Sequence, residues 1–311
     1  MIYGSVCSGI EAATVAWHDI KKSDGTPVGW KPAFFSDIEK FPRAVLAHHY
    51  PTVPCHGDFT TIGENEYAPI DLLVGGTPCQ SFSIAGLRKG LDDDRGNLAL
   101  EFIRLAKRLR PRWILWENVP GVLSSNKGRD FGSFLGGLAE CGYGFAYRVL
   151  DAQYFGAPQR RRRVFVVGYL GDWRRAAAVL FERESLQGDI TPIQGNRTIR
   201  GRNKTTFGCF DTRGVNAFDR ADLDNILFFP VPRRPTPLEV ERSFGFSDDY
   251  TKINEKTADG PRYKALGNSM AVPVMRWLGE RIQMVDDITV DNNPNFCTHA
   301  DVNGKDVKSP E

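Results

Sequence analysis

The segment Ile70-Asp-Leu-Leu-Val-Gly-Gly-Thr-Pro-Cys-Gln-Ser-Phe-Ser83 is the most informative stretch of this 311-residue sequence. Its first six residues are mainly apolar and predict a buried strand. Gly75, Gly76 and Pro78 then predict a sharp turn that presents Cys79 at the end of that strand. A lone cysteine is most often a small buried hydrophobic residue. The turn and the polar residues after it favour the alternative, an exposed nucleophilic thiolate.

Short apolar runs alternate with helical patterns on both sides of this segment. The predicted strands cover residues 2–6, 31–35, 70–75, 113–116 and 164–167, and the predicted helices cover residues 10–17, 41–49 and 98–109. In the last helix Leu98, Phe102, Leu105 and Leu109 recur at helical spacing, and Pro111 ends it. This alternation predicts an α/β fold, with a mostly parallel sheet that has helices on both faces. Ligands of such folds bind at the carboxyl ends of the strands.

Composition excludes several other classes of protein. With 41% hydrophobic and 25% charged residues, the chain is neither disordered nor collagen-like nor a coiled coil. The six cysteines form no Cys-x-x-Cys pair, which argues against a zinc or dithiol site, and we expect no metal. No leader and no apolar run of about 18 residues is visible, so we expect a cytoplasmic protein without a membrane span.

The net charge of +2 conceals a local concentration of basic residues. Residues 160–204 hold eleven Lys and Arg against four Asp and Glu, a balance of +7. Such a stretch indicates either a surface that contacts phosphates or a solvated face, and the residues alone leave both open. Regular patterns also fade from Gly171 to Pro232. They return at Thr236-Pro237-Leu238-Glu239, which predicts a capped helix start, and in a helix over residues 270–284.

Two further segments carry ionisable groups at strand ends. Glu117 follows the apolar strand 113–116, where burial raises a carboxyl pKa and favours a role as acid, although a turn or helix-cap carboxylate is the alternative. In Gln159-Arg-Arg-Arg-Arg-Val-Phe-Val-Val-Gly168, alternation along a strand places Arg161 and Arg163 on one face. Their neighbours Arg160 and Arg162 then point to the other face.

In this order the three segments resemble those of DNA (cytosine-5)-methyltransferases, which have a Pro-Cys nucleophile, then Glu-Asn-Val, then Gln-x-Arg-x-Arg. Six more segments are similar to motifs of that family, and the similarity spans about residues 2–285: 5–13, 35–39, 57–60, 95–98, 233–242 and 267–273. The chain departs from the pattern at Ser5 and Cys7, where Asp and Phe are usual. It also departs at Glu11, where a second Gly is common, and at Asp37, where Glu is usual.

The resemblance implies a Rossmann-like S-adenosylmethionine-dependent methyltransferase fold with a small target-recognition domain. Residues 1–168 would form the catalytic and cofactor-binding domain and 169–232 the recognition domain. Residues 233–285 would return to the catalytic domain, and 286–311 would be an acidic flexible tail. The implied activity is methyl transfer to carbon 5 of cytosine in double-stranded DNA, by base flipping and a covalent adduct with the cysteine. S-adenosylhomocysteine would be the product.

The resemblance also implies roles for single residues. The catalytic residues would be Cys79, Glu117, Arg161 and Arg163. The cofactor-binding residues would be Cys7, Gly9, Ile10, Asp37, Ile38, Asp58, Phe59, Pro78, Leu98, Asn268 and Ser269. The DNA-binding residues would be Gln80, Ser83, Arg95, Arg200, Arg202, Lys204 and Arg233. We expect a monomeric stand-alone modification enzyme of a bacterium or phage. A tRNA cytosine-5 methyltransferase and a non-catalytic DNA-binding relative are the alternatives.

Overall fold

The computed structural model describes residues 1–21, 25–78, 98–182, 227–228 and 232–288. Its strands are β1 (Ile2–Val6), β2 (Lys31–Ser36), β3 (Cys55–His56), β4 (Leu72–Gly75), β5 (Trp113–Asn118), β6 (Tyr143–Asp151), β7 (Arg162–Leu170), β8 (Leu227–Phe228) and β9 (Pro232–Arg233). Its α-helices are α1 (Ala12–Trp17), α2 (Lys40–His49), α4 (Leu98–Leu109), α5 (Arg129–Glu140), α6 (Trp173–Leu180), α8 (Pro237–Phe244), α9 (Asp259–Asn268) and α10 (Val272–Asp286). Short 3-10 helices are η1 (Phe59–Thr61), η2 (Pro120–Leu123), η3 (Ser125–Gly128) and η4 (Ala152–Phe155).

In the described chain, seven strands form one sheet in the order β3-β2-β1-β4-β5-β7-β6. The pairs among β1 to β5 are parallel, whereas β7 runs antiparallel to both β5 and β6. This confirms the predicted α/β fold with a mostly parallel sheet. The strand order reverses between β1 and β4, because the chain leaves β1 toward β2 and returns on the other side. Ligands of open α/β sheets bind at such a reversal.

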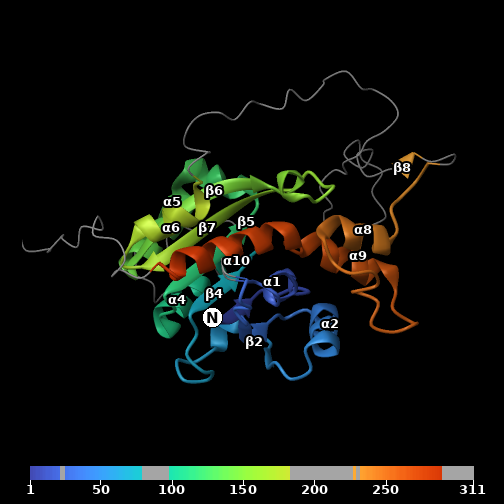
Figure 1. The fold of residues 1–311 in the computed structure, drawn as a ribbon, viewed down its shortest axis with the longest axis horizontal. Helices are drawn as coiled ribbons and strands as arrows, with labels where there is room; N and C mark the ends of the chain where they lie inside the picture. The colour runs from blue at the N-terminus through green and yellow to red at the C-terminus, as the bar shows by residue number, and fades with distance from the viewer. Residues whose placement is uncertain (22–24, 79–97, 183–226, 229–231, 289–311) are drawn as a thin grey trace, which may run out of the picture.

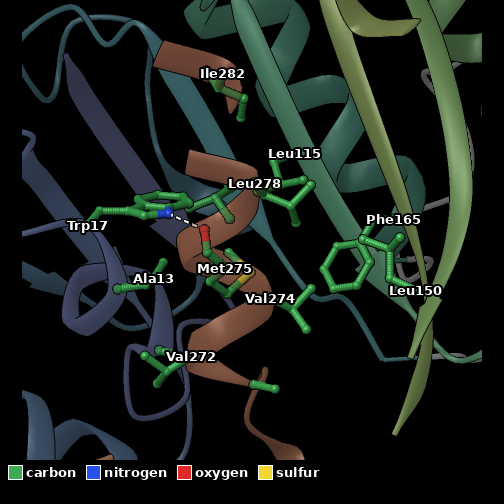
Figure 2. Close-up of a cluster of buried hydrophobic side chains, with 14 of the residues drawn as sticks. Ala13, Trp17, Leu115, Leu150, Phe165, Val272, Val274, Met275, Leu278 and Ile282 are labelled. Atoms are coloured by element: carbon green, nitrogen blue, oxygen red, sulfur yellow. Dashed lines mark hydrogen bonds between the residues drawn. The ribbon is translucent and has the colours of Figure 1, made fainter. Parts of the chain in front are cut away.

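Two hydrophobic cores cover the two faces of the sheet. On one face the helices α1, α6 and α10 pack together, and α10 lies across the sheet (Figure 1). Figure 2 shows Met275 and Leu278 of α10 between Trp17 and the side chains of the sheet, with the Trp17 indole donating to the Met275 carbonyl oxygen at 2.6 Å. On the opposite face α4 and α5 cover the sheet through Phe102 and Phe134, both fully buried.

The predicted elements are largely confirmed. The helix over 98–109 has the predicted bounds, and Thr236 and Glu239 form a reciprocal capping box at the start of α8. Several described elements were not predicted, among them α5, β6, α6 and α9. The helix α6 packs against β6, β7 and α10, at positions where the sequence indicated irregular chain. Within the described residues no helix is long and apolar enough to cross a membrane.

The Gly75-Gly76 pair has a different role from the predicted sharp turn. Neither glycine has a positive φ. A Cβ atom on Gly75 would instead lie 3.0 Å from the Val6 carbonyl oxygen, and one on Gly76 would lie 3.1 Å from Glu117 Oε2. Neither position therefore has room for a larger side chain, because Gly75 packs against β1 and Gly76 packs against the Glu117 carboxylate.

Candidate active site

The carboxyl ends of β1, β2, β4 and β5 surround a cavity of about 460 Å³. Most of the sequence-predicted cofactor and catalytic residues lie around it: Cys7, Gly9, Asp37, Ile38, Asp58, Phe59, Pro78, Leu98, Glu117, Arg161, Arg163 and Asn268. These residues come from sequence positions 7 to 268. The fold therefore brings nine predicted cofactor residues and three predicted catalytic residues to one cavity.

Three predicted residues lie elsewhere. Ile10 is fully buried in the hydrophobic core and does not line the cavity. Ser269 lines a smaller adjoining cavity of about 30 Å³. Arg233 pairs with Glu239 on α8, at 2.8 Å. The predicted residues Cys79, Gln80, Ser83, Arg95, Arg200, Arg202 and Lys204 lie outside the described residues.

The loop after β1, residues 7–11, has three residues with a positive φ, and we call it the left-handed loop. Cys7, Gly9 and Glu11 have φ values of 48°, 55° and 62°. The Gly9 amide donates to Asp37 Oδ2 at 2.9 Å, and the Glu39 amide donates to Asp37 Oδ1 at 2.8 Å. Burial raises the pKa of the Asp37 carboxyl. Asp37 thus ties the loop to the end of β2, and each of its oxygens keeps a second lone pair for a ligand hydroxyl.

Asp58 and Phe59, at the start of the 3-10 helix η1, also line the cavity. The Asp58 side chain caps this helix by accepting from the Thr60 amide at 3.0 Å, and Phe59 is buried. The Ile38 side chain, which lines the same cavity, is 73% exposed, which is unusual for a large apolar residue. Ile38 and Phe59 therefore offer two apolar surfaces to a planar group, with a carboxylate beside them.

Glu117 and Arg163 form an ion pair at the end of β5. Arg163 Nε lies 3.0 Å from Glu117 Oε1, and the two side chains are 15% and 12% exposed. Burial raises the pKa of the Glu117 carboxyl, and the positive charges of Arg163 and Arg161 oppose that rise. The predicted rise of this pKa is thus confirmed in direction. A carboxyl with a raised pKa can donate a proton near neutral pH.

Arg161, the residue before β7, and Arg163, within β7, both line the cavity, while Arg160 and Arg162 are exposed. The contacts of Arg161 differ from those of Arg163, however. Arg161 is buried and donates to the carbonyl oxygens of Gly267, at 3.0 Å, and Ser269, at 2.7 Å. Its guanidinium also lies 5.0 Å from the centre of the Phe244 ring. Arg161 therefore positions the turn that carries Asn268, whereas Arg163 positions Glu117.

Asn118 and Thr77 are functional neighbours that the sequence interpretation missed. The Asn118 amide donates to the Thr77 carbonyl oxygen at 2.9 Å, and the Trp116 indole donates to Thr77 Oγ1 at 2.9 Å. These bonds fix the residue that precedes Pro78. The sequence did indicate Asn118, which is the middle residue of the Glu-Asn-Val motif, but a role was predicted only for the Glu117 carboxylate of that motif.

Comparison with known protein families gives a match over residues 1–208, two thirds of the chain, to the C-5 cytosine-specific DNA methylases. The chain is 34% identical to an Escherichia phage P1 protein named DNA N-6-adenine-methyltransferase, over 91% of this chain and 61% of that protein. The chain thus spans less than two thirds of that relative. It is 31% identical to the type II methyltransferase M1.ScrFI of Lactococcus lactis subsp. cremoris, over 88% of this chain and 76% of that protein.

Solved structures share the same fold. The methyltransferase EhMeth of Entamoeba histolytica has a TM-score of 0.65 at 16% identity, covering 91% of this chain and 97% of that one. The Dnmt2 methyltransferase of S. pombe has a TM-score of 0.61 at 16% identity, covering 93% and 100%. Both show a Rossmann-like methyltransferase fold for this chain. The family match over residues 1–208 shows that the chain belongs to the C-5 cytosine-specific DNA methylases.

Proposed function

We propose that this protein transfers a methyl group from S-adenosylmethionine to carbon 5 of cytosine in double-stranded DNA. One observation carries the proposal: the buried Glu117–Arg163 pair lies in the same cavity as Pro78, the residue directly before Cys79. The family match supports the same reaction. The recognised base would enter this cavity from a flipped-out position, because carbon 5 and carbon 6 are inaccessible inside a duplex.

The cavity fits S-adenosylmethionine. Asp37 would accept the ribose hydroxyls, Asp58 would accept the adenine amino group, and Ile38 and Phe59 would hold the adenine ring between them. Gly9 lets the backbone approach the methionine portion closely, since a Cβ is absent and φ is 55°. Bound there, S-adenosylmethionine supplies an electrophilic methyl group and leaves as S-adenosylhomocysteine.

The residues of the chain activate the base. The Cys79 thiolate forms a bond to carbon 6, and the electron pair of the 5,6 double bond becomes nucleophilic at carbon 5, while Glu117 gives a proton to ring nitrogen 3. After methylation the carbon-5 proton leaves to solvent, the double bond re-forms, the bond to Cys79 breaks and nitrogen 3 returns its proton to Glu117. Cys7 also lines the cavity, but burial raises its thiol pKa to about 12, which leaves it protonated and poorly nucleophilic.

Two other acceptors require a test. The name of the phage P1 relative refers to adenine N6, although more than a third of that protein lies outside the match. Direct transfer to an exocyclic amine needs no thiolate. A tRNA cytosine is the other acceptor, and a chain that binds DNA without catalysis is the third alternative.

The proposed biological role is that of a stand-alone modification enzyme, a monomer in the cytoplasm, that protects bacterial or phage DNA.

The experiment incubates the protein with S-adenosylmethionine carrying a labelled methyl group and either duplex DNA or tRNA, followed by nucleoside mass spectrometry. We expect labelled 5-methylcytosine from DNA. Labelled N6-methyladenine, or label only in tRNA, would replace the proposed acceptor. Binding of DNA without label in either polymer would favour the non-catalytic alternative.

A further inference from the structure

Glu11 is a buried carboxylate that the proposed chemistry does not use. The residue is 1% exposed and ends the left-handed loop after β1. Its Oε2 accepts from the Thr14 amide at 3.1 Å and from Thr14 Oγ1 at 2.6 Å, and its Oε1 accepts from the Ser5 hydroxyl. All three donors are neutral groups.

Buried carboxylates of the described chain differ in their partners: Asp130 accepts only from the neutral Ser125 hydroxyl and Asn126 amide, whereas others have a cationic partner. Glu117 pairs with Arg163 at 3.0 Å, and Glu241 pairs with Arg262 at 3.0 Å. For Glu11 the described residues provide hydrogen bonds but no ion pair with a basic side chain. A buried carboxylate without a counter-charge is costly. Glu11 caps the start of α1 and, unlike Asp130, lines a cavity, so a cationic ligand can supply the missing counter-charge.

The backbone of Glu11 supports a functional reason for its position. Its φ and ψ are 62° and 56°, a left-handed conformation that a residue with a side chain rarely adopts. Strained residues of this kind persist where the surroundings fix them, and they cluster at ligand sites. Ser5 and Thr14 fix Glu11 from two sides, because they hold both of its oxygens.

Glu11 also lies at the inner end of the cofactor cavity. The smaller cavity of about 30 Å³ is lined by Ser5 and Glu11. It shares Gly9, Gly76 and Asn268 with the larger cavity, so the two adjoin. The carboxylate is therefore next to the region that receives the methionine portion of the cofactor.

We propose that the Glu11 carboxylate makes this site prefer the positively charged cofactor over its neutral product, an inference that rests on the proposed function. Methyl transfer converts the sulfonium of S-adenosylmethionine into the uncharged thioether of S-adenosylhomocysteine, while the other charged groups stay the same. Burial raises the pKa of the Glu11 carboxyl, a bound sulfonium opposes that rise, and the carboxylate attracts the charge that the reaction removes. Glu11 thus favours cofactor binding before the reaction and product release after it.

Calorimetric titration of three ligands tests the proposal: S-adenosylmethionine, S-adenosylhomocysteine, and sinefungin, which carries an amine in place of the sulfonium. Glu11→Gln removes the charge but keeps the size and an oxygen acceptor. We expect this variant to lose at least about tenfold more affinity for the two cationic ligands than for S-adenosylhomocysteine, because only the cationic ligands lose an attraction to the charge of Glu11. Thr14→Val is the control, because it disturbs the same hydrogen bonds without changing charge, and all three ligands should weaken by a similar factor.

Thermal unfolding establishes that each variant is folded at the titration temperature. If Glu11→Gln does not fold, Glu11→Gly removes the charge and suits the left-handed φ. Equal loss of affinity for all three ligands in the charge-removing variant would overturn the inference and leave the cofactor assignment intact. A wild-type protein that binds neither S-adenosylmethionine nor S-adenosylhomocysteine would overturn both.

Discussion

Arg163 Nε lies 3.0 Å from Glu117 Oε1, where the start of β7 meets the end of β5. The antiparallel pairing of these two strands sets the relationship, because it brings the first residues of β7 beside the last residues of β5. The Glu117 carboxyl, which would hold cytosine nitrogen 3, is therefore both buried and paired with the positive charge of Arg163. Its protonation depends on the balance between these two effects.

This balance predicts a pH dependence of methyl transfer. Glu117 acts in its protonated form and Cys79 as a thiolate, so kcat/KM should fall at low pH as Cys79 is protonated and fall again as the pH rises through the raised pKa of Glu117. Removing the Arg163 charge, as in Arg163→Met, removes an influence that lowers this pKa. The falling limb of the pH profile should then move to higher pH.

Glu117→Gln is the matched control for this profile. It should reduce kcat about 10²- to 10⁴-fold and abolish the falling limb, because no titrating group remains at that position. If the fall of the rate at high pH keeps the same midpoint in both Arg163→Met and Glu117→Gln, a group other than Glu117 controls the rate.

Arg161 should act through structure rather than through the base. Arg161→Met removes two hydrogen bonds to the carbonyl oxygens of Gly267 and Ser269 in a buried site. We expect the free energy of unfolding to fall by about 3 kcal/mol, and cofactor affinity to fall because Asn268 lines the cavity. Chemical denaturation measures the first effect and calorimetry the second. The exposed neighbour Arg160, changed to Ala, should alter the unfolding free energy by less than about 0.5 kcal/mol.

The sequence predicts the parallel half of this fold well, because its strands are short, apolar and separated by amphipathic helices. It predicts the rest poorly for physical reasons. The helix α5 contains Gly132, Gly136 and Gly137, which lower helix propensity, yet Gly137 packs closely against Ile103. In β6 only a minority of residues are buried, so its alternation is weak.

The candidate site shows the same contrast. Motifs locate Glu117, Asp37 and Arg163, because charged residues at strand ends stand out in a sequence. The left-handed loop is not predictable, since only glycine signals a positive φ and Cys7 and Glu11 carry side chains. The first helix consequently begins at Ala12 rather than at residue 10. The partners of Arg161 lie more than a hundred residues away and depend on tertiary packing.

Arg160 and Arg162 are predicted to contact DNA phosphates. Both are exposed at the start of β7, the same edge of the sheet as the cavity, and their side chains have no ion pair within the described residues. Each arginine changed to Ala should weaken DNA binding and reduce the slope of log K against log salt by about 1. Arg110→Ala is the control, since this exposed residue follows α4 and precedes the opposite end of β5. An unchanged slope in the Arg160 and Arg162 variants would place the phosphates elsewhere.

The basic residues between β7 and β8 allow the same measurement. Arg200 and Lys204 lie outside the described residues, and their proposed role rests on sequence alone. Arg200→Ala or Lys204→Ala should also weaken DNA binding with a reduced salt slope. If only these variants change the slope, the segment around residue 200 carries the phosphate contacts.

Cys79→Ser tests the nucleophile directly. Serine has a far less acidic and less nucleophilic side chain, so transfer to DNA should become undetectable, while affinity for S-adenosylmethionine stays near the wild-type value. Cys55 is a half-buried cysteine that lines neither cavity, so Cys55→Ser is the matched control and should transfer the methyl group normally.

DNA with fluorine at carbon 5 of the target cytosine adds a second readout. Because carbon 5 then has no proton to lose, the bond between Cys79 and carbon 6 cannot break. A complex that survives denaturation should form with the wild type and with Cys55→Ser but not with Cys79→Ser. Equal transfer by Cys79→Ser and the wild type would eliminate Cys79 as the nucleophile.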